Sequence, residues 1–131
     1  MLCTTALATA RAQLVPPPSA ACAEQRAARL RSLVADHTHA WVRQVEPPES
    51  YAAGTRLFAY RIAKTKLRCA DLAHGVAELQ TAHAVYGKPV SGVPAAQAKR
   101  TVSLIVKVRS ELNQETLRRC QSRKGQRASR V

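Results

Sequence analysis

The sequence predicts an all-α fold: a long antiparallel helical hairpin preceded by a shorter helix, with an irregular N-terminal segment and a basic C-terminal tail. Two observations lead to this prediction. Apolar residues recur at alternating steps of three and four along three stretches, which is the spacing of one helical face. Prolines and glycines separate these stretches and mark where each helix stops. The expected single helical domain covers residues 23–119.

Residues 1–22 are expected to be irregular, because they end in a run of three prolines that favours an extended polyproline-like segment. A first helix is predicted over residues 23–45. Its apolar face is formed by Ala27, Leu30, Val34, His37 and Trp41. The prolines at positions 47 and 48 stop this helix, because the residue before a proline avoids helical geometry.

A second helix is predicted over residues 55–87, with Thr55 as its N-cap and Ser50 as an alternative start. One face repeats with a strict alternation of four and three, as in a coiled coil. Its members are Phe58, Ile62, Thr65, Cys69, Leu72, Val76, Leu79, His83 and Tyr86. Gly87 stands where a helix-ending glycine belongs, and Pro89 follows it.

A third helix is predicted over residues 94–119, because Pro94 suits a first helical turn, where its missing N–H costs nothing. The short connection between the second and third helices is typical of neighbouring antiparallel helices. Residues 120–131 form the expected basic tail.

The charge balance points to an anionic partner. The chain carries 21 Lys and Arg against 8 Asp and Glu, a net charge of +13. Such an excess favours nucleic acid first and an anionic membrane surface second. With few aromatic residues to stack on single strands, we expect contact with folded RNA through phosphate groups. The predicted RNA-binding residues are Arg61, Lys64, Arg68, Lys99, Arg100, Lys107, Arg118, Arg119, Arg123, Lys124, Arg127 and Arg130.

Catalysis is not expected. Glu111 and Glu115 are the carboxylates at helical-neighbour spacing, and both are expected to face solvent rather than a pocket. The histidines and cysteines lack the spacing of a metal site, so we predict no catalytic residue, metal, cofactor or small-molecule substrate. No stretch is long and apolar enough for a transmembrane helix.

The four cysteines, at positions 3, 22, 69 and 120, form no C-x-x-C pair. Three disulfide connectivities are possible, and the spacing favours none of them. We expect free thiols in a reducing compartment. The N-terminal residues admit two interpretations: a secretory signal, with Ala10-Arg11-Ala12 as a cleavage site, or an organellar transit segment.

Two blocks carry a family resemblance. Leu72 through Glu78-Leu79 precedes Tyr86-Gly87-Lys88, and Lys99-Arg100 opens an apolar run that ends at Val108. In pattern and spacing, residues 71–115 resemble the large-subunit ribosomal protein family numbered twenty-nine in bacteria, a helical hairpin near the peptide exit tunnel. That family's first helix has an E-L pair before a glycine turn, and its second opens with paired cations. Leu104 stands where the family usually has Arg.

The resemblance implies a non-catalytic ribosomal protein that binds ribosomal RNA and neighbouring proteins of a large assembly. The extra N-terminal helix and the C-terminal tail suit a mitochondrial relative in the matrix. Two alternatives stay open. One is an accessory helical subunit of a mitochondrial respiratory membrane complex, whose cations would meet cardiolipin or acidic subunits. The other is a secreted or periplasmic helical protein with a disulfide.

Overall fold

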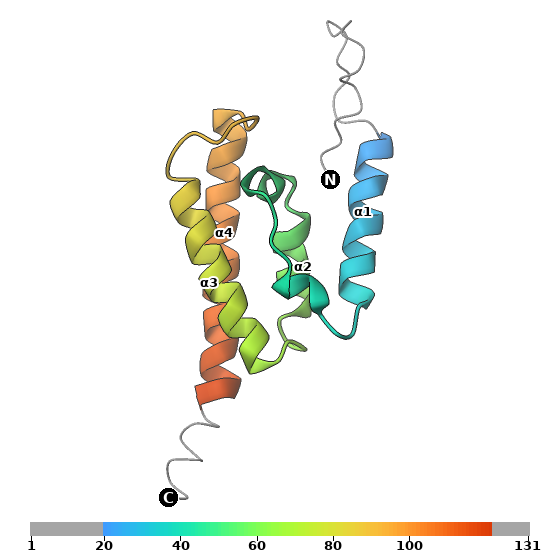
Figure 1. Cartoon of the computed structure of the whole chain (residues 1–131), viewed down its shortest axis with the longest axis vertical. Coiled ribbons are helices and arrows are strands. Elements are labelled where there is room, and N and C mark those ends of the chain that lie inside the picture. Colours follow the sequence, from blue (N-terminus) through green and yellow to red (C-terminus); the bar gives the residue numbers. More distant parts are fainter. Residues whose placement is uncertain (1–19, 122–131) are drawn as a thin grey trace, which may run out of the picture.

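The computed structural model describes residues 20–121, and these form an all-α fold that confirms the predicted class (Figure 1). The α-helices are α1 (Ala20–Ala35), α2 (Thr55–Ala63), α3 (Cys69–Val85) and α4 (Ala95–Glu115). Two 3-10 turns, η3 (Ala40–Arg43) and η4 (Pro48–Ala53), connect α1 to α2, and a π-helical turn, η5 (Thr116–Gln121), follows α4. No helix in this range is long and apolar enough to cross a bilayer.

The first helix is shorter than predicted, because α1 ends at Ala35 rather than near residue 45. Asp36 provides the reason. Its carboxylate accepts hydrogen bonds from the Thr38 N–H at 2.9 Å, the Thr38 hydroxyl at 2.6 Å and the Ala40 N–H at 3.2 Å. Such a local side-chain turn competes with helical hydrogen bonding. The chain then passes through His39, whose φ of 52° is left-handed, into η3.

The predicted helix over residues 55–87 is two helices, α2 and α3, separated by a turn at residues 64–68. The Ala63 carbonyl accepts the N–H groups of both Lys66 and Leu67, and Leu67 is buried there. The break turns α2 so that Leu57 and Tyr60 face the core. Phe58 and Ile62, assigned to the apolar face by the sequence, are 42% and 52% exposed.

The predicted apolar face does hold along α3, which packs beside α4 (Figure 1). Leu72 and Leu79 of α3 are fully buried, as are Ile105 and Leu112 of α4. Gly75 of α3 faces both α2 and α4. A Cβ there would lie 2.8 Å from the Tyr60 ring and 3.0 Å from a Leu112 methyl. The glycine therefore lets the Tyr60 ring lie against the α3 backbone.

A disulfide between Cys69 and Cys120 joins the start of α3 to η5, with 5.8 Å between the Cα atoms. Cys22 is also disulfide-bonded, so the prediction of free thiols is wrong for the described cysteines. The Cys69–Cys120 bond closes a loop across 51 residues of sequence. In the chain-entropy model such a loop contributes about 4 kcal/mol. Cys120 therefore belongs with the helical domain and not with the predicted tail.

The third predicted helix begins one residue late, with Pro94 as its N-cap, and continues through η5. Thr55 is likewise the first residue of α2 rather than its cap, because Gly54 occupies the N-cap position. The irregular segment predicted over residues 1–22 and the tail predicted over 120–131 lie mostly outside the described residues.

Candidate functional site

The predicted RNA-binding cations fall into different environments. Arg61 of α2 and Lys64, directly after it, both bind Glu111 of α4, at 2.8 and 3.0 Å. The hydrogen bonds from Arg61, with those from Lys64, hold the pKa of Glu111 below its ordinary value. Arg68 does not continue this row, since it follows the break and pairs with Asp71. The predicted stripe of Arg61, Lys64 and Arg68 is therefore divided between two acidic partners.

Three of the four cations of α4 are exposed. Lys99, Arg100 and Lys107 have exposed side chains, and within the described residues none lies in an ion pair. Arg100, Leu104, Lys107 and Glu111 follow one another at steps of four, three and four, so they share one side of α4. Glu111 contacts α2, which places this side of α4 along α2.

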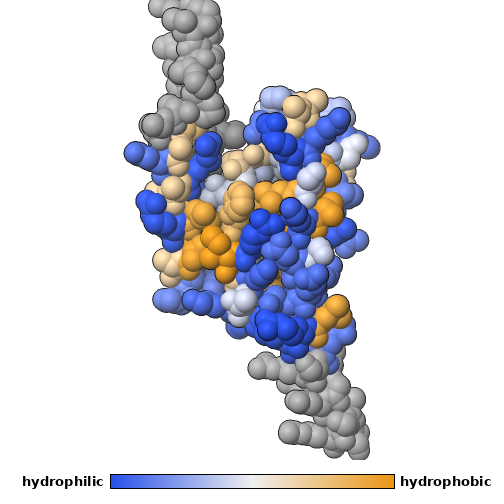
Figure 2. Space-filling model, turned by 180° about the vertical axis from the view of Figure 1, so that it is seen from behind, coloured by the Kyte–Doolittle hydropathy of each residue, from blue (hydrophilic) through white to orange (hydrophobic). Residues whose placement is uncertain are grey.

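One surface therefore combines cations with exposed apolar groups. We call it the α2–α4 face, made up of Phe58, Arg61, Ile62, Lys64, Arg100, Leu104, Lys107 and Glu111. Gly54 lies between the α2 and α4 residues of this face. A Cβ at this position would lie 3.3 Å from the Phe58 ring of α2 and 4.0 Å from Leu104 of α4. The Arg61 guanidinium lies 6.0 Å from the Phe58 ring centroid. Figure 2, viewed from behind, shows apolar and hydrophilic surface interleaved over this side of the molecule.

The described cations after α4, Arg118 and Arg119, make contacts within the protein. Arg118 and Arg119 both bind Glu115. Arg119 also donates to the backbone carbonyls of Lys64 and Leu67, at 2.7 and 3.1 Å, and so fastens η5 to the turn between α2 and α3. The remaining predicted residues, Arg123, Lys124, Arg127 and Arg130, lie outside the described residues.

Sequence reasoning missed a buried network around Arg56, which is 4% exposed. Its Nε and Nη2 donate to the two Glu78 oxygens at 2.6 and 2.7 Å, and its Nη1 donates to the Trp41 carbonyl at 2.8 Å. The hydroxyls of Tyr51 and Tyr60 donate to the same carboxylate at 2.6 and 2.8 Å. In the sequence Arg56 is one more cation in a basic cluster, and nothing there marks it as buried.

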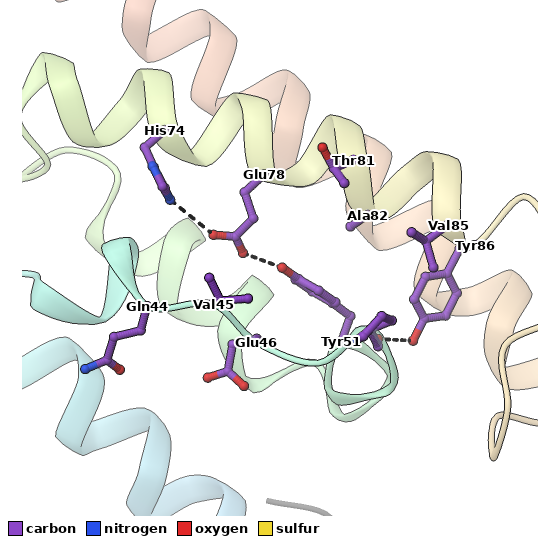
Figure 3. Close-up of a pocket in the computed structure, with 11 residues that line it drawn as sticks. Gln44, Val45, Glu46, Tyr51, His74, Glu78, Thr81, Ala82, Val85 and Tyr86 are labelled. Carbon is purple, nitrogen blue, oxygen red and sulfur yellow. Dashed lines mark hydrogen bonds and ion pairs between the residues drawn. The ribbon is translucent and has the colours of Figure 1, made fainter.

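A cavity of about 280 Å³ adjoins this network (Figure 3). Val45, Ala82 and Val85 supply apolar walls, and Glu78 also lines the cavity, with His74 Nε2 4.0 Å from its carboxylate. The figure shows the Tyr51 side chain pointing at Glu78. The Tyr86 hydroxyl donates a hydrogen bond to the Pro48 carbonyl of η4 at 2.8 Å. Because Arg56 and two phenols already occupy the Glu78 carboxylate, it is poorly suited to act as a general base. The cluster is best explained as a structural element.

The two phenols bound to Glu78 are strongly perturbed. Burial raises the pKa of Tyr51 well above its ordinary value, and the hydrogen bond to Glu78 adds to the rise. Burial and the Glu78 charge do the same to the pKa of Tyr60. Both groups therefore remain protonated donors at neutral pH.

No family model matches the chain, and neither curated proteins nor solved structures give a match.

Proposed function

We propose that the protein is a non-catalytic binding protein that docks on an anionic lipid surface through its α2–α4 face, in an oxidising compartment. The observation that carries the proposal is the composition of that face. The face carries four cations, Arg61, Lys64, Arg100 and Lys107, and a single carboxylate, Glu111, which Arg61 and Lys64 bind, so it has an excess of positive charge. Phe58 and Ile62 stand exposed among them.

Cations beside exposed apolar groups suit the surface of a membrane better than they suit RNA. A lipid surface offers both a negative potential and an apolar layer just beneath the headgroups. Phe58 and Ile62 lose water contact on such a surface, whereas phosphate backbones give them no comparable partner. The exposed apolar side chains thus favour lipid.

The disulfides bear on the compartment. The Cys69–Cys120 bond and the bonded state of Cys22 favour an oxidising environment, such as the periplasm or the cell exterior, over the reducing mitochondrial matrix. This supports the secreted or periplasmic alternative and fits a peripheral role at a membrane surface.

Binding to ribosomal RNA is the second candidate. The exposed cations Lys99, Arg100 and Lys107 favour it, since none is neutralised by a carboxylate in the described part of the chain. Under this proposal the same α4 residues contact phosphates and give strongly salt-dependent binding. Membership of a ribosome rests on the sequence resemblance alone.

Lys107→Gln tests the lipid proposal. In co-sedimentation with vesicles of equimolar phosphatidylcholine and phosphatidylglycerol, the variant should bind about fivefold more weakly, because a cation near an anionic surface contributes about 1 kcal/mol. Arg31→Gln is the matched control: it removes one exposed cation from α1, away from the α2–α4 face. Equal weakening by both variants would show that only net charge matters, and would contradict the proposed face.

A further inference from the structure

A second cavity lies between α1 and the start of α2, and its volume is about 490 Å³. Arg26, Arg29 and Leu33 of α1 line one side, while Ser50, Thr55 and Arg56 line the other. It is distinct from the α2–α4 face, because that face lies where α2 meets α4, whereas this cavity lies where α2 meets α1.

The charges lining this cavity are unbalanced. Glu46 is its one carboxylate, and it binds Arg29 at 2.8 Å with Arg56 at 3.8 Å. Arg56 is further balanced by Glu78, which lies outside this cavity. Arg26 has no carboxylate partner among the described residues. The cavity therefore keeps one guanidinium that is not neutralised.

The α2 N-terminus adds donors. Gly54 is the N-cap and offers no side chain to the first turn, which also lacks an acidic residue. The first α2 hydrogen bond to a preceding carbonyl is from Phe58 to Gly54, so the N–H groups of Thr55 and Arg56 have no partner in the described chain. Unpaired N–H groups at a helix start attract anions.

The Thr55 side chain adds a donor that does not depend on the helix end. Thr55 lines the cavity and is 9% exposed, yet its hydroxyl has no hydrogen-bond partner among the described residues. The hydroxyl is not sealed inside the protein, so it is open to a hydrogen bond with a ligand in the cavity. A ligand oxygen in the cavity would satisfy the hydroxyl, the α2 amides and Arg26 together.

We propose that this cavity binds a small organic anion, a carboxylate or a phosphate monoester that carries a compact apolar group. The anionic oxygens accept hydrogen bonds from the Thr55 hydroxyl, the first α2 amides and Arg26. The apolar group lies against Ala28, Leu33 and Ala53, which also line the cavity. The size of the cavity suits a ligand of this kind.

Phenyl phosphate, benzoate and inorganic phosphate are the probes. Calorimetry on the full, oxidised chain should show 1:1 binding of phenyl phosphate or benzoate, tighter than that of inorganic phosphate, which lacks the apolar group. Whichever organic anion binds more tightly identifies the headgroup. Amide resonances of Thr55 and Arg56 should shift on binding. If neither organic anion binds at millimolar concentration, the proposal is overturned.

Thr55→Val and Arg26→Gln should each weaken binding of the organic probe by about tenfold, because each loses a hydrogen bond to a charged group. Arg31→Gln, on the same helix but outside the cavity, should bind like the wild type. Thermal melting of each variant checks that it folds. Unchanged affinity in both cavity variants would overturn the proposal. Since vesicle binding uses other residues, it can fail while this site binds, and the reverse also holds.

Discussion

Arg56 and Glu78 show how a single ion pair organises the interior. The guanidinium is almost completely buried, and its remaining N–H groups bind backbone carbonyls of the segment between α1 and α2. The Arg56 carbon Cζ also lies 5.5 Å from the Trp41 ring centroid. A buried pair is tolerated only when its other hydrogen bonds are satisfied, as they are here. The network thereby connects α2, α3 and η3.

Glu78→Ala should lower the free energy of unfolding by about 3–5 kcal/mol, because it leaves a buried guanidinium without its counter-charge. Urea denaturation measures the change. Glu111→Ala, which breaks the more exposed pairs with Arg61 and Lys64, is the control and should cost at most about 1 kcal/mol. Similar losses in the two variants would contradict the structural role given to the Arg56–Glu78 pair.

The same network predicts sensitivity to alkali. The folded pKa of Tyr60 lies above its unfolded value of about 10, so the folded state holds the phenolic proton more tightly. The resulting stability is present below about pH 10 and is lost as the pH rises toward the folded pKa. Urea titrations at successive pH values should show a steeper alkaline loss for the wild type than for Tyr60→Phe. Parallel curves would refute this linkage.

At the scale of the elements, the apolar pattern predicts α3 and α4 well and fails at α2. The nine residues of α2 are apolar on more than one side, since Leu57 and Tyr60 compete with Phe58 and Ile62. Periodicity alone cannot choose between the two faces. The choice is made by Arg56, whose burial turns Tyr60 inward, and by the turn at Leu67. Both are tertiary effects that no local pattern reports.

Gly75→Ala tests the packing of α2 on α3. Alanine would favour the helix by up to about 1 kcal/mol, but its Cβ would clash with the fully buried Tyr60 ring. Overpacking of this kind costs about 1–3 kcal/mol, so thermal melting should show a net loss of stability. Ala77→Gly, at an exposed position of the same helix, measures how much alanine stabilises this helix over glycine where no packing is involved. A stabilised Gly75→Ala variant would mean that Tyr60 packs elsewhere.

The candidate site was partly accessible from sequence. Charge counting singled out Arg61, Lys64, Arg100 and Lys107, and the structure places these residues on one surface. Charge counting did not reveal that Glu111 pairs with two of these cations, or that Phe58 and Ile62 are exposed beside them. Pairing of distant residues, like the Cys69–Cys120 bond, depends on how helices meet. Spacing along the chain contains no such information.

For the molecule as a whole, the described residues form one helical unit whose C-terminal end is joined to α3 by a disulfide. Cys69–Cys120 fixes η5 against α3, and Arg119 adds hydrogen bonds across the same junction. These contacts tie the segment after α4 to the turn that follows α2, next to the α2–α4 face. With its excess of cations and its exposed apolar side chains, this face accounts for the proposed preference for an anionic lipid surface.

A competition experiment tests this preference most directly. The oxidised protein is mixed with phosphatidylglycerol vesicles and a structured RNA at equal anionic charge, and sedimentation then measures how the protein divides between them. The proposed function predicts that most protein sediments with the vesicles, and that Phe58→Ser shifts it toward RNA, because the variant loses apolar contact but no charge. Retention on the RNA, with no effect of Phe58→Ser, would contradict the lipid proposal and favour the ribosomal one.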